Sequence, residues 1–198
     1  MSERLRPLIQ RAVLDIVEYD YQTRTEMVQL NRQMPFCVMS YLKRGEALLR
    51  IQDREYCCRD GDAIFVPPNV IHDHVKMSRE ESEFLWWHFN FRTAYNIDVL
   101  SLLKLPYKVH MENSSEFEQK FFGYMEAIQN EKTIADMIYK NAKALEVLAC
   151  IFDSFLKSEK TQLAPDIPVV FMDIFDDISQ RPTAGMNLKT LAEKYHMN

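Results

Sequence analysis

The stretch Gly61-Asp-Ala-Ile-Phe-Val-Pro67-Pro-Asn69-Val-Ile-His72-Asp-His74 decides the fold. The Arg-Asp-Gly-Asp sequence around Gly61 is a strong tight-turn signal. The apolar run from Ala63 to Val66 has the length of a short strand and ends at two prolines. His72 and His74 are two residues apart, so their side chains lie on the same face of a strand. The stretch therefore predicts two short strands separated by turns.

Short strand patterns continue outward from this stretch, from about Val13 to Phe91. Turn residues punctuate them at intervals of seven to ten residues, at Gly45, Asp53, Gly61, Pro68 and Ser78. Short apolar segments at this spacing are typical of an antiparallel sandwich or barrel.

The pattern becomes helical after Asn113. Ser114 or Ser115 can cap a first helix, whose apolar residues recur every three or four positions. A second helix is expected over about 133–157, a third over about 167–179, and a short one, capped by Asn187, over 188–195. The last helix has no sequence left to pack against, so we expect this chain to end within a domain.

Composition excludes several classes of protein. The 198 residues carry 24 Lys and Arg against 29 Asp and Glu, and this net charge of −5 argues against an overall field that attracts nucleic acid. No apolar run approaches the roughly 20 residues that span a bilayer, and the N-terminus lacks the apolar region of a secretory signal. The neighbouring Cys57 and Cys58 do not readily bridge within a strand. We therefore expect a cytoplasmic protein with reduced thiols and no membrane contact.

The segment Phe84-Leu-Trp-Trp-His-Phe-Asn-Phe91 predicts a strand with two different faces. One face carries Leu85, Trp87, Phe89 and Phe91 and suits burial against the helical layer. The other carries Phe84, Trp86, His88 and Asn90, which suits a polar ligand such as a sugar: the Trp stacks and the others form hydrogen bonds. The alternative is that Trp86 and His88 are core residues with satisfied polar atoms.

The opening stretch resembles the second conserved motif of cupins, because Gly61, Pro67 and His72 occupy its fixed positions. Asn69 replaces a glycine of that motif, and Asn also accepts left-handed backbone geometry. The resemblance implies a cupin-like β-domain.

Metal-dependent cupins also carry a first motif with two His and one Glu, and this chain lacks it. Val38 occupies the Glu position, and Asn31 and Gln33, or Arg32 and Met34, occupy the His positions. A transition-metal site needs three or four donors, so His72 alone does not make one. A site rebuilt from His72, His74 and His88 is disfavoured, and no cofactor is expected.

Nearly the whole chain resembles the AraC family of bacterial transcription regulators. The run Leu188-Lys-Thr-Leu191-Ala192-Glu-Lys-Tyr-His-Met is similar to the start of the family's first helix-turn-helix. The segment Trp86-Trp87-His88-Phe89 is close to an aromatic-x-His-Phe pattern of the family. The run from Arg54 to Asp62, continued through Pro67-Pro68 and Ile71-His72, resembles the arabinose-responsive members.

This resemblance implies an α+β chain: an antiparallel cupin-like barrel or sandwich, a helical dimerisation hairpin and a truncated helix-turn-helix segment. Residues 1–111 would be the effector-binding domain with an N-terminal arm, 112–160 the two-helix dimerisation segment, 161–168 the linker, and 166–198 the start of the DNA-binding domain. A recognition helix is missing from this chain, so DNA would be bound only through the full-length protein. Residues 1–12 are either the arm or a short helix on the sheet.

In sugar-responsive relatives, ligand contacts come from the residue two positions after the histidine of the cupin motif, which is His72 here. Further contacts come from alternate residues of the strand that corresponds to 84–91, and from an arginine. The matching positions are His74, Trp86, His88 and, more loosely, Arg32. Together with His72 and Tyr41 they form the expected ligand-binding set. Their side chains differ from those of the arabinose-responsive members, so we do not transfer that ligand. The expected effector is a sugar or a related polar metabolite.

The second predicted helix carries a heptad-like stripe. Its members are Ile138, Asn141, Leu145, Leu148, Phe152 and Phe155. The stripe is either the seam of a homodimer or the face that packs on the β-layer, and different faces can serve both.

We therefore expect a ligand sensor rather than an enzyme. The alternative is a metal-independent cupin enzyme, such as a sugar epimerase or isomerase. That enzyme needs a base and an acid, for which His72 with Asp73, or a pocket residue such as Tyr41, can be proposed. Strand alternation counts against His72 with Asp73, since neighbouring side chains point to opposite faces.

Overall fold

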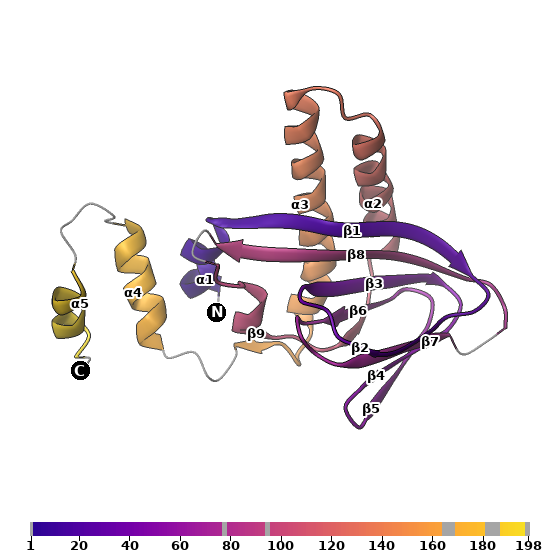
Figure 1. The fold of residues 1–198 in the computed structure, drawn as a ribbon, viewed down its shortest axis with the longest axis horizontal. Coiled ribbons are helices and arrows are strands. Elements are labelled where there is room, and N and C mark those ends of the chain that lie inside the picture. Colours follow the sequence, from indigo (N-terminus) through magenta and orange to yellow (C-terminus); the bar gives the residue numbers. More distant parts are fainter. Residues whose placement is uncertain (1, 77–78, 94–95, 164–168, 181–186, 197–198) are drawn as a thin grey trace. The chain divides into compact units, whose positions relative to one another are not determined.

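A computed structural model describes residues 2–76, 79–93, 96–163, 169–180 and 187–196 of the chain (Figure 1). They belong to two compact units. The larger unit comprises residues 14–90 and 105–161, and the smaller comprises 1–13, 91–104 and 162–198.

The larger unit is a sandwich of two antiparallel sheets, followed in the chain by two helices (Figure 1). The sheet that we call the long sheet has the strand order β1 (Ala12–Arg24), β8 (Ser82–Thr93), β3 (Cys37–Arg44), β6 (Asp62–Val66) and β10 (Lys108–His110). The short sheet has the order β2 (Val28–Arg32), β7 (His72–Lys76), β4 (Ala47–Ile51) and β5 (Arg54–Cys58). The fold is therefore the expected cupin-like α+β sandwich, and the strands that the structure describes form two sheets that do not close into a barrel.

The turns around β6 use left-handed backbone, as the sequence motif predicts. Gly61 has φ of 80° and Asn69 has φ of 63°. Asn69 thus takes the conformation that the glycine of the cupin motif would take. The amide of Asn69 donates to the carbonyl of Met34 at 2.7 Å, which joins this turn to the segment before β3.

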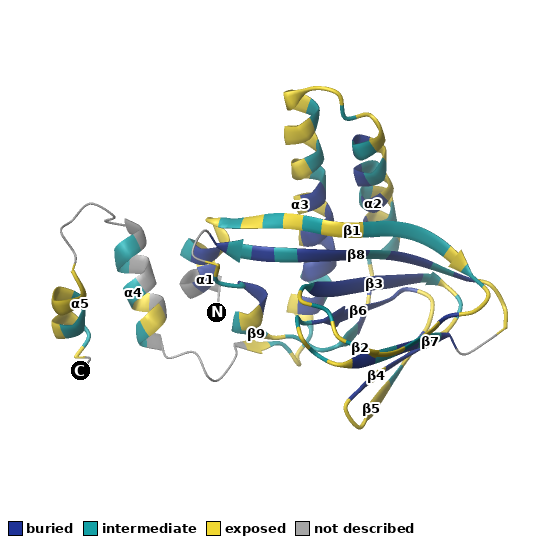
Figure 2. Cartoon of the chain, viewed as in Figure 1, coloured by how far each residue is buried: buried dark blue, intermediate teal, exposed yellow. Residues whose placement is uncertain are grey.

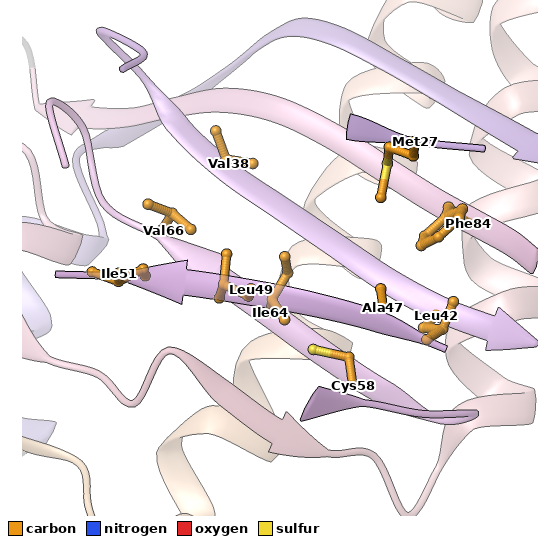
Figure 3. Close-up of a cluster of buried hydrophobic side chains, with 10 residues drawn as sticks. All are labelled: Met27, Val38, Leu42, Ala47, Leu49, Ile51, Cys58, Ile64, Val66 and Phe84. Atoms are coloured by element: carbon orange, nitrogen blue, oxygen red, sulfur yellow. The ribbon is translucent and has the colours of Figure 1, made fainter. Parts of the chain in front are cut away.

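The inner faces of the two sheets enclose an apolar cluster, shown in Figure 3. Its buried members are Met27, Val38, Leu42, Ala47, Leu49, Ile51, Cys58, Ile64, Val66 and Phe84. Removal of such side chains from water stabilises a fold by roughly 1.5–3 kcal/mol for each large aliphatic or aromatic group.

The outer face of the long sheet packs against α2 (Ser114–Gln129) and α3 (Ile134–Lys157). Trp87 of β8 contacts Phe121 of α2, with ring centroids 6.4 Å apart, and Phe65 of β6 contacts Phe152 of α3 at 6.0 Å. Leu85, Trp87 and Phe89 are fully buried. The apolar face of β8 therefore lies against the helices, as the alternation predicts.

The two helices begin at residues with side chains that differ in how they cap. Asn113 is the N-cap of α2, so the prediction that Ser114 or Ser115 caps this helix is wrong. Thr133 caps α3 in a capping box, in which its side chain and that of Asp136 each accept from the other's backbone amide.

The heptad-like stripe of α3 divides into two halves. Leu148, Phe152 and Phe155 are buried, and the rings of Phe152 and Phe155 contact Phe65 of β6. For this half of the stripe, the interpretation as a face that packs on the β-layer is right. Ile138 is 66% exposed, Leu145 is 46% exposed, and Asn141 is also exposed. Figure 2 shows the same division along α3, from exposed near its start to buried toward the sheet.

The smaller unit contains a series of short elements. They are α1 (Ser2–Ile9), the 3₁₀ turn Leu100–Leu102, β9 (Leu103–Lys104) paired with β11 (Gln162–Leu163), α4 (Val169–Gln180) and α5 (Leu188–Lys194). Residues 2–9 are thus helical. The side chain of Asn187 caps α5 by accepting from the amide of Thr190, as predicted.

Part of the predicted C-terminal region lies outside the described residues. The expected start of the third helix at residue 167 and most of the linker at 161–168 lie outside the described residues. Cys57 is exposed and Cys58 is buried, as strand alternation predicts, and neither forms a disulfide. Within the described residues, no helix is both long and apolar enough to span a bilayer.

Candidate functional site

A cavity of about 240 Å³ lies between the two sheets of the larger unit. Five strands and the residue before β2 contribute its lining: Glu18, Gln22 and Arg24 of β1, Met27, Gln29 and Arg32 around β2, Val38 and Ser40 of β3, His74 of β7, and Phe84, Trp86 and His88 of β8. Met27, Val38 and Phe84 also belong to the apolar cluster of Figure 3. The cavity therefore has an apolar end and a polar wall.

Strand β8 presents its mixed face to this cavity. Phe84, Trp86 and His88 line the cavity, whereas Asn90 does not and instead donates to the carboxylate of Asp15 at 3.4 Å. The Trp86 and His88 rings are 4.8 Å apart, and Phe36 stacks on His88 with ring centroids 5.1 Å apart. The alternation thus places a half-buried indole and an imidazole side by side on the cavity wall.

A chain of hydrogen bonds fixes the imidazole of His88. Nη2 of Arg32 lies 3.1 Å from Nε2 of His88, and Nδ1 of His88 lies 3.1 Å from a carboxylate oxygen of Glu18. Because a guanidinium only donates, Nε2 accepts and the ring proton sits on Nδ1, from which it is donated to Glu18. Burial, followed by the charge of Arg32, lowers the pKa of His88, so the ring is neutral near pH 7.

The two arginines of the cavity are held by neutral groups. Nη1 of Arg32 donates to Oε1 of Gln29 at 2.9 Å, and Nε of Arg24 donates to Oε1 of Gln22 at 2.7 Å. Burial lowers the pKa of Arg32; Glu18 opposes this shift and the neighbouring charge of Arg24 adds to it. The two cations are therefore close enough to repel each other.

His74 and His72 lie on one face of β7, and both are buried. His74 lines the cavity, and its ring meets the edge of Phe84 with centroids 5.9 Å apart. Burial, reinforced by the nearby charges, lowers the pKa of His74 to about 3. The imidazole is therefore neutral near pH 7 and can act only as a neutral hydrogen-bond partner.

His72 is outside the lining of this cavity. Its Nδ1 lies 3.0 Å from the carbonyl of Val70, and its buried Nε2 has no partner among the described residues. The residue borders a separate recess with Asn31, Arg50 and Asp73. His72 is thus a neighbour of the cavity and not part of its wall.

The structure corrects the expectation for Tyr41. This side chain is on the outer face of β3, where its hydroxyl donates to Glu118 of α2 at 2.7 Å and its ring contacts Phe117 at 5.0 Å. Its neighbour Ser40 faces the cavity instead. Tyr41 therefore cannot bind a ligand there or serve as its acid.

The other acid–base pair is not assembled at the cavity either. Asp73 neighbours His72 on β7 and accepts from the backbone amide of Asn31 at 2.8 Å. Neither residue is in the cavity lining. Across the described part of the chain, no three His, Cys, Asp or Glu side chains are grouped so as to hold a metal ion.

Five polar residues of the cavity wall are not in the ligand-binding set expected from the sequence. Glu18, Gln22 and Arg24 come from β1, and Gln29 and Ser40 come from β2 and β3. A signal for the β1 residues exists, because polar side chains occupy the alternate positions 18, 20, 22 and 24 of a strand.

Comparison with known proteins identifies the family. Residues 29–142, more than half of the chain, match the family model described as the AraC-like ligand binding domain. The chain belongs to this family. A search of curated protein sequences finds no match to the AraC-like chain.

Solved structures similar to this AraC-like domain have low sequence identity. A cupin superfamily protein from Desulfitobacterium hafniense is 13% identical over 39% of this chain and 75% of its own, with a TM-score of 0.30. The protein TT1209 from Thermus thermophilus is 18% identical over 40% of this chain and 83% of its own, with a TM-score of 0.33. YhaK from Escherichia coli is 11% identical over 50% of this chain and 44% of its own, with a TM-score of 0.38.

Proposed function

We propose that this AraC-like domain is the ligand-sensing part of a bacterial transcription regulator and binds a carbohydrate in the cavity between its sheets. The observation that carries the proposal is the cavity wall on β8, where the half-buried ring of Trp86 lies beside a His88 of fixed orientation. An indole face packs against the C–H groups of a sugar ring, while neighbouring polar groups bind its hydroxyls.

The size and polarity of the cavity suit one sugar ring. Its volume of about 240 Å³ is below the roughly 300–1,000 Å³ typical of sites for drug-sized ligands. Ser40, Gln29 and His74 provide a hydroxyl, an amide and an imidazole for hydroxyl groups of the ligand.

The effector would act through a homodimer. Ile138 and Leu145 lie seven residues apart on the exposed half of α3, with Asn141 between them. A second copy of this chain fits such a stripe, because heptad spacing lets two helices interdigitate and a polar residue within the seam fixes their register. Effector binding that favours one arrangement of the dimer would change the spacing of attached DNA-binding domains.

One observation is relevant to the alternative, a metal-independent sugar epimerase or isomerase. His88 is oriented by Glu18, as a general base would be. However, Nε2 of His88 already accepts from Arg32, so its lone pair is occupied. This hydrogen bond favours a binding role for His88 over proton abstraction.

A thermal-shift screen of the 198-residue chain against mono- and disaccharides tests the proposal. We expect a responsive sugar to raise the melting temperature by mass action, and the Trp86→Ala and His88→Ala variants to lose this rise while keeping their far-ultraviolet circular dichroism. Leu30→Ala on exposed β2 is the control and should respond like the native chain. Equal shifts in all variants would refute the site, and conversion of the sugar into a product would favour the enzyme.

A further inference from the structure

We propose that the effector is a sugar acid, a monosaccharide whose single carboxylate is held between Arg24 and Arg32. This inference rests on the proposed function, because it names the chemical class of ligand for the same cavity.

Arg32 is positioned to receive an anion. Its guanidinium uses two of its five N–H groups, one toward Oε1 of Gln29 and one toward Nε2 of His88. Both acceptors are neutral, and no described carboxylate hydrogen-bonds to this guanidinium. The contacts hold the planar group still and leave three N–H donors for the two oxygens of a ligand carboxylate, a geometry that suits a bidentate pair.

Arg24 provides the second cation from the opposite sheet. Its Nε and Nη2 both donate to Oε1 of Gln22, whose own amide donates to Asp20 at 2.7 Å. Nη1 of Arg24 has no partner among the described residues. Arg24 thus resembles Arg32: each is anchored by a glutamine and keeps donors free at the cavity.

The formal charge of the lining selects one negative charge. Arg24 and Arg32 contribute two cations, and Glu18, whose side chain is 59% exposed, contributes one anion. His74 and His88 are neutral near pH 7 because burial lowers their pKa. The lining therefore carries a formal charge of +1, which a monocarboxylate neutralises and a phosphate dianion exceeds. Between sheets, where the effective dielectric is below that of water, this match matters more than at a surface.

The other end of the cavity fixes the direction of the ligand. Met27, Val38 and Phe84 form an apolar boundary that offers nothing to a carboxylate. The charged group is therefore directed toward the arginines, and the ring of the sugar lies along Trp86.

Isothermal titration calorimetry on the 198-residue chain tests the inference with matched probes. D-Glucuronate and D-galacturonate are compared with D-glucose and D-galactose, and D-glucose 6-phosphate separates a carboxylate from a phosphate. We expect at least one acid to bind about ten times more tightly than its neutral parent. Arg24→Gln should weaken acid binding about tenfold or more and change neutral-sugar binding less than about threefold. Arg32→Gln also frees His88 and therefore weakens neutral-sugar binding to some extent, but it should weaken acid binding about tenfold more than that. Arg54→Gln, an exposed arginine of β5, is the matched control and should change neither.

The outcomes separate this inference from the proposed function. Neutral sugars that bind as tightly as their acids, with no effect of the arginine variants, would overturn the sugar-acid inference and leave the carbohydrate sensor standing. A preference for the sugar phosphate would overturn the monocarboxylate. Absence of binding by every acid and neutral sugar would count against both proposals.

Discussion

Nη2 of Arg32 and Nε2 of His88 lie 3.1 Å apart, although Arg32 belongs to the short sheet and His88 to the long one. This hydrogen bond joins the two layers of the sandwich at the cavity. Since Arg32 is charged and His88 is buried, we expect a measurable coupling energy between them.

A double-mutant cycle measures that coupling. Arg32→Gln, His88→Ala and the double variant should give a coupling free energy of about 1 kcal/mol in urea unfolding. As a control, Arg32→Gln combined with Tyr139→Phe on exposed α3 should be additive within about 0.5 kcal/mol. Additivity of the first pair as well would mean that the contact contributes nothing to stability.

The two halves of the α3 stripe should respond differently to substitution. Leu145→Glu places a charge on the exposed half, so we expect a folded monomer in sedimentation velocity. Phe152→Ala removes a ring that packs on Phe65, and should lower the free energy of unfolding by about 3–5 kcal/mol without a specific effect on association. Ala142→Glu, exposed on α3 outside the stripe, is the control. A dimer that survives Leu145→Glu would exclude the stripe as the seam.

Stability should fall as the pH is lowered, because His74 is buried in its neutral form. Its pKa is about 3 in the fold, below its ordinary value of 6.5, so the unfolded chain binds a proton that the folded chain refuses between these pH values. Going from about pH 7.5 to about pH 5.0 should cost about 2 kcal/mol through this residue. Burial lowers the pKa of His72 and His88 as well, so they act in the same direction.

His74→Gln isolates this contribution. The variant should lose less stability between the two pH values than the native chain does, by about 2 kcal/mol in urea unfolding. Leu30→Gln, at an exposed position of β2 that carries no titratable group, is the control and should leave the pH dependence unchanged. The same pH dependence in His74→Gln as in the native chain would contradict the assignment to His74.

Tyr41 should matter for stability and not for binding. Tyr41→Phe removes the 2.7 Å hydrogen bond to Glu118 and should lower the free energy of unfolding by about 1–2 kcal/mol. The melting-temperature rise caused by a responsive sugar should be unchanged. A loss of that rise would place Tyr41 in the binding machinery after all.

Much of the fold follows from local signals in the sequence. The alternation of β8 assigns Trp86 and Trp87 to opposite faces, since one face is apolar and the other mixed. Asn69 takes the predicted left-handed backbone because its side chain is short and polar. Thr133 and Asn187 begin helices for the same local reason, a side-chain oxygen placed to accept a free amide.

The faces of β3 could not be predicted in the same way. Cys37 through Leu42 are all buried, because the long sheet is covered by the short sheet on one side and by helices on the other. A strand buried on both faces shows no apolar–polar alternation, so nothing local distinguishes Ser40 from Tyr41. A different limit applies to β1. Its alternation marks a polar face, but its place beside β8 depends on pairing between segments that lie far apart in the chain.

Strand β1 lies at the edge of the long sheet, and its neighbour among the described strands is β8. It nevertheless supplies Glu18, Gln22 and Arg24 to the cavity. An edge strand detaches more readily than a central one, since fewer hydrogen bonds hold it. A ligand bound by these three side chains therefore also holds β1 on the sheet. Slower exchange of the β1 amide hydrogens with deuterium would then report that the cavity is occupied. Dissociation of the ligand would in turn require local opening of this edge strand.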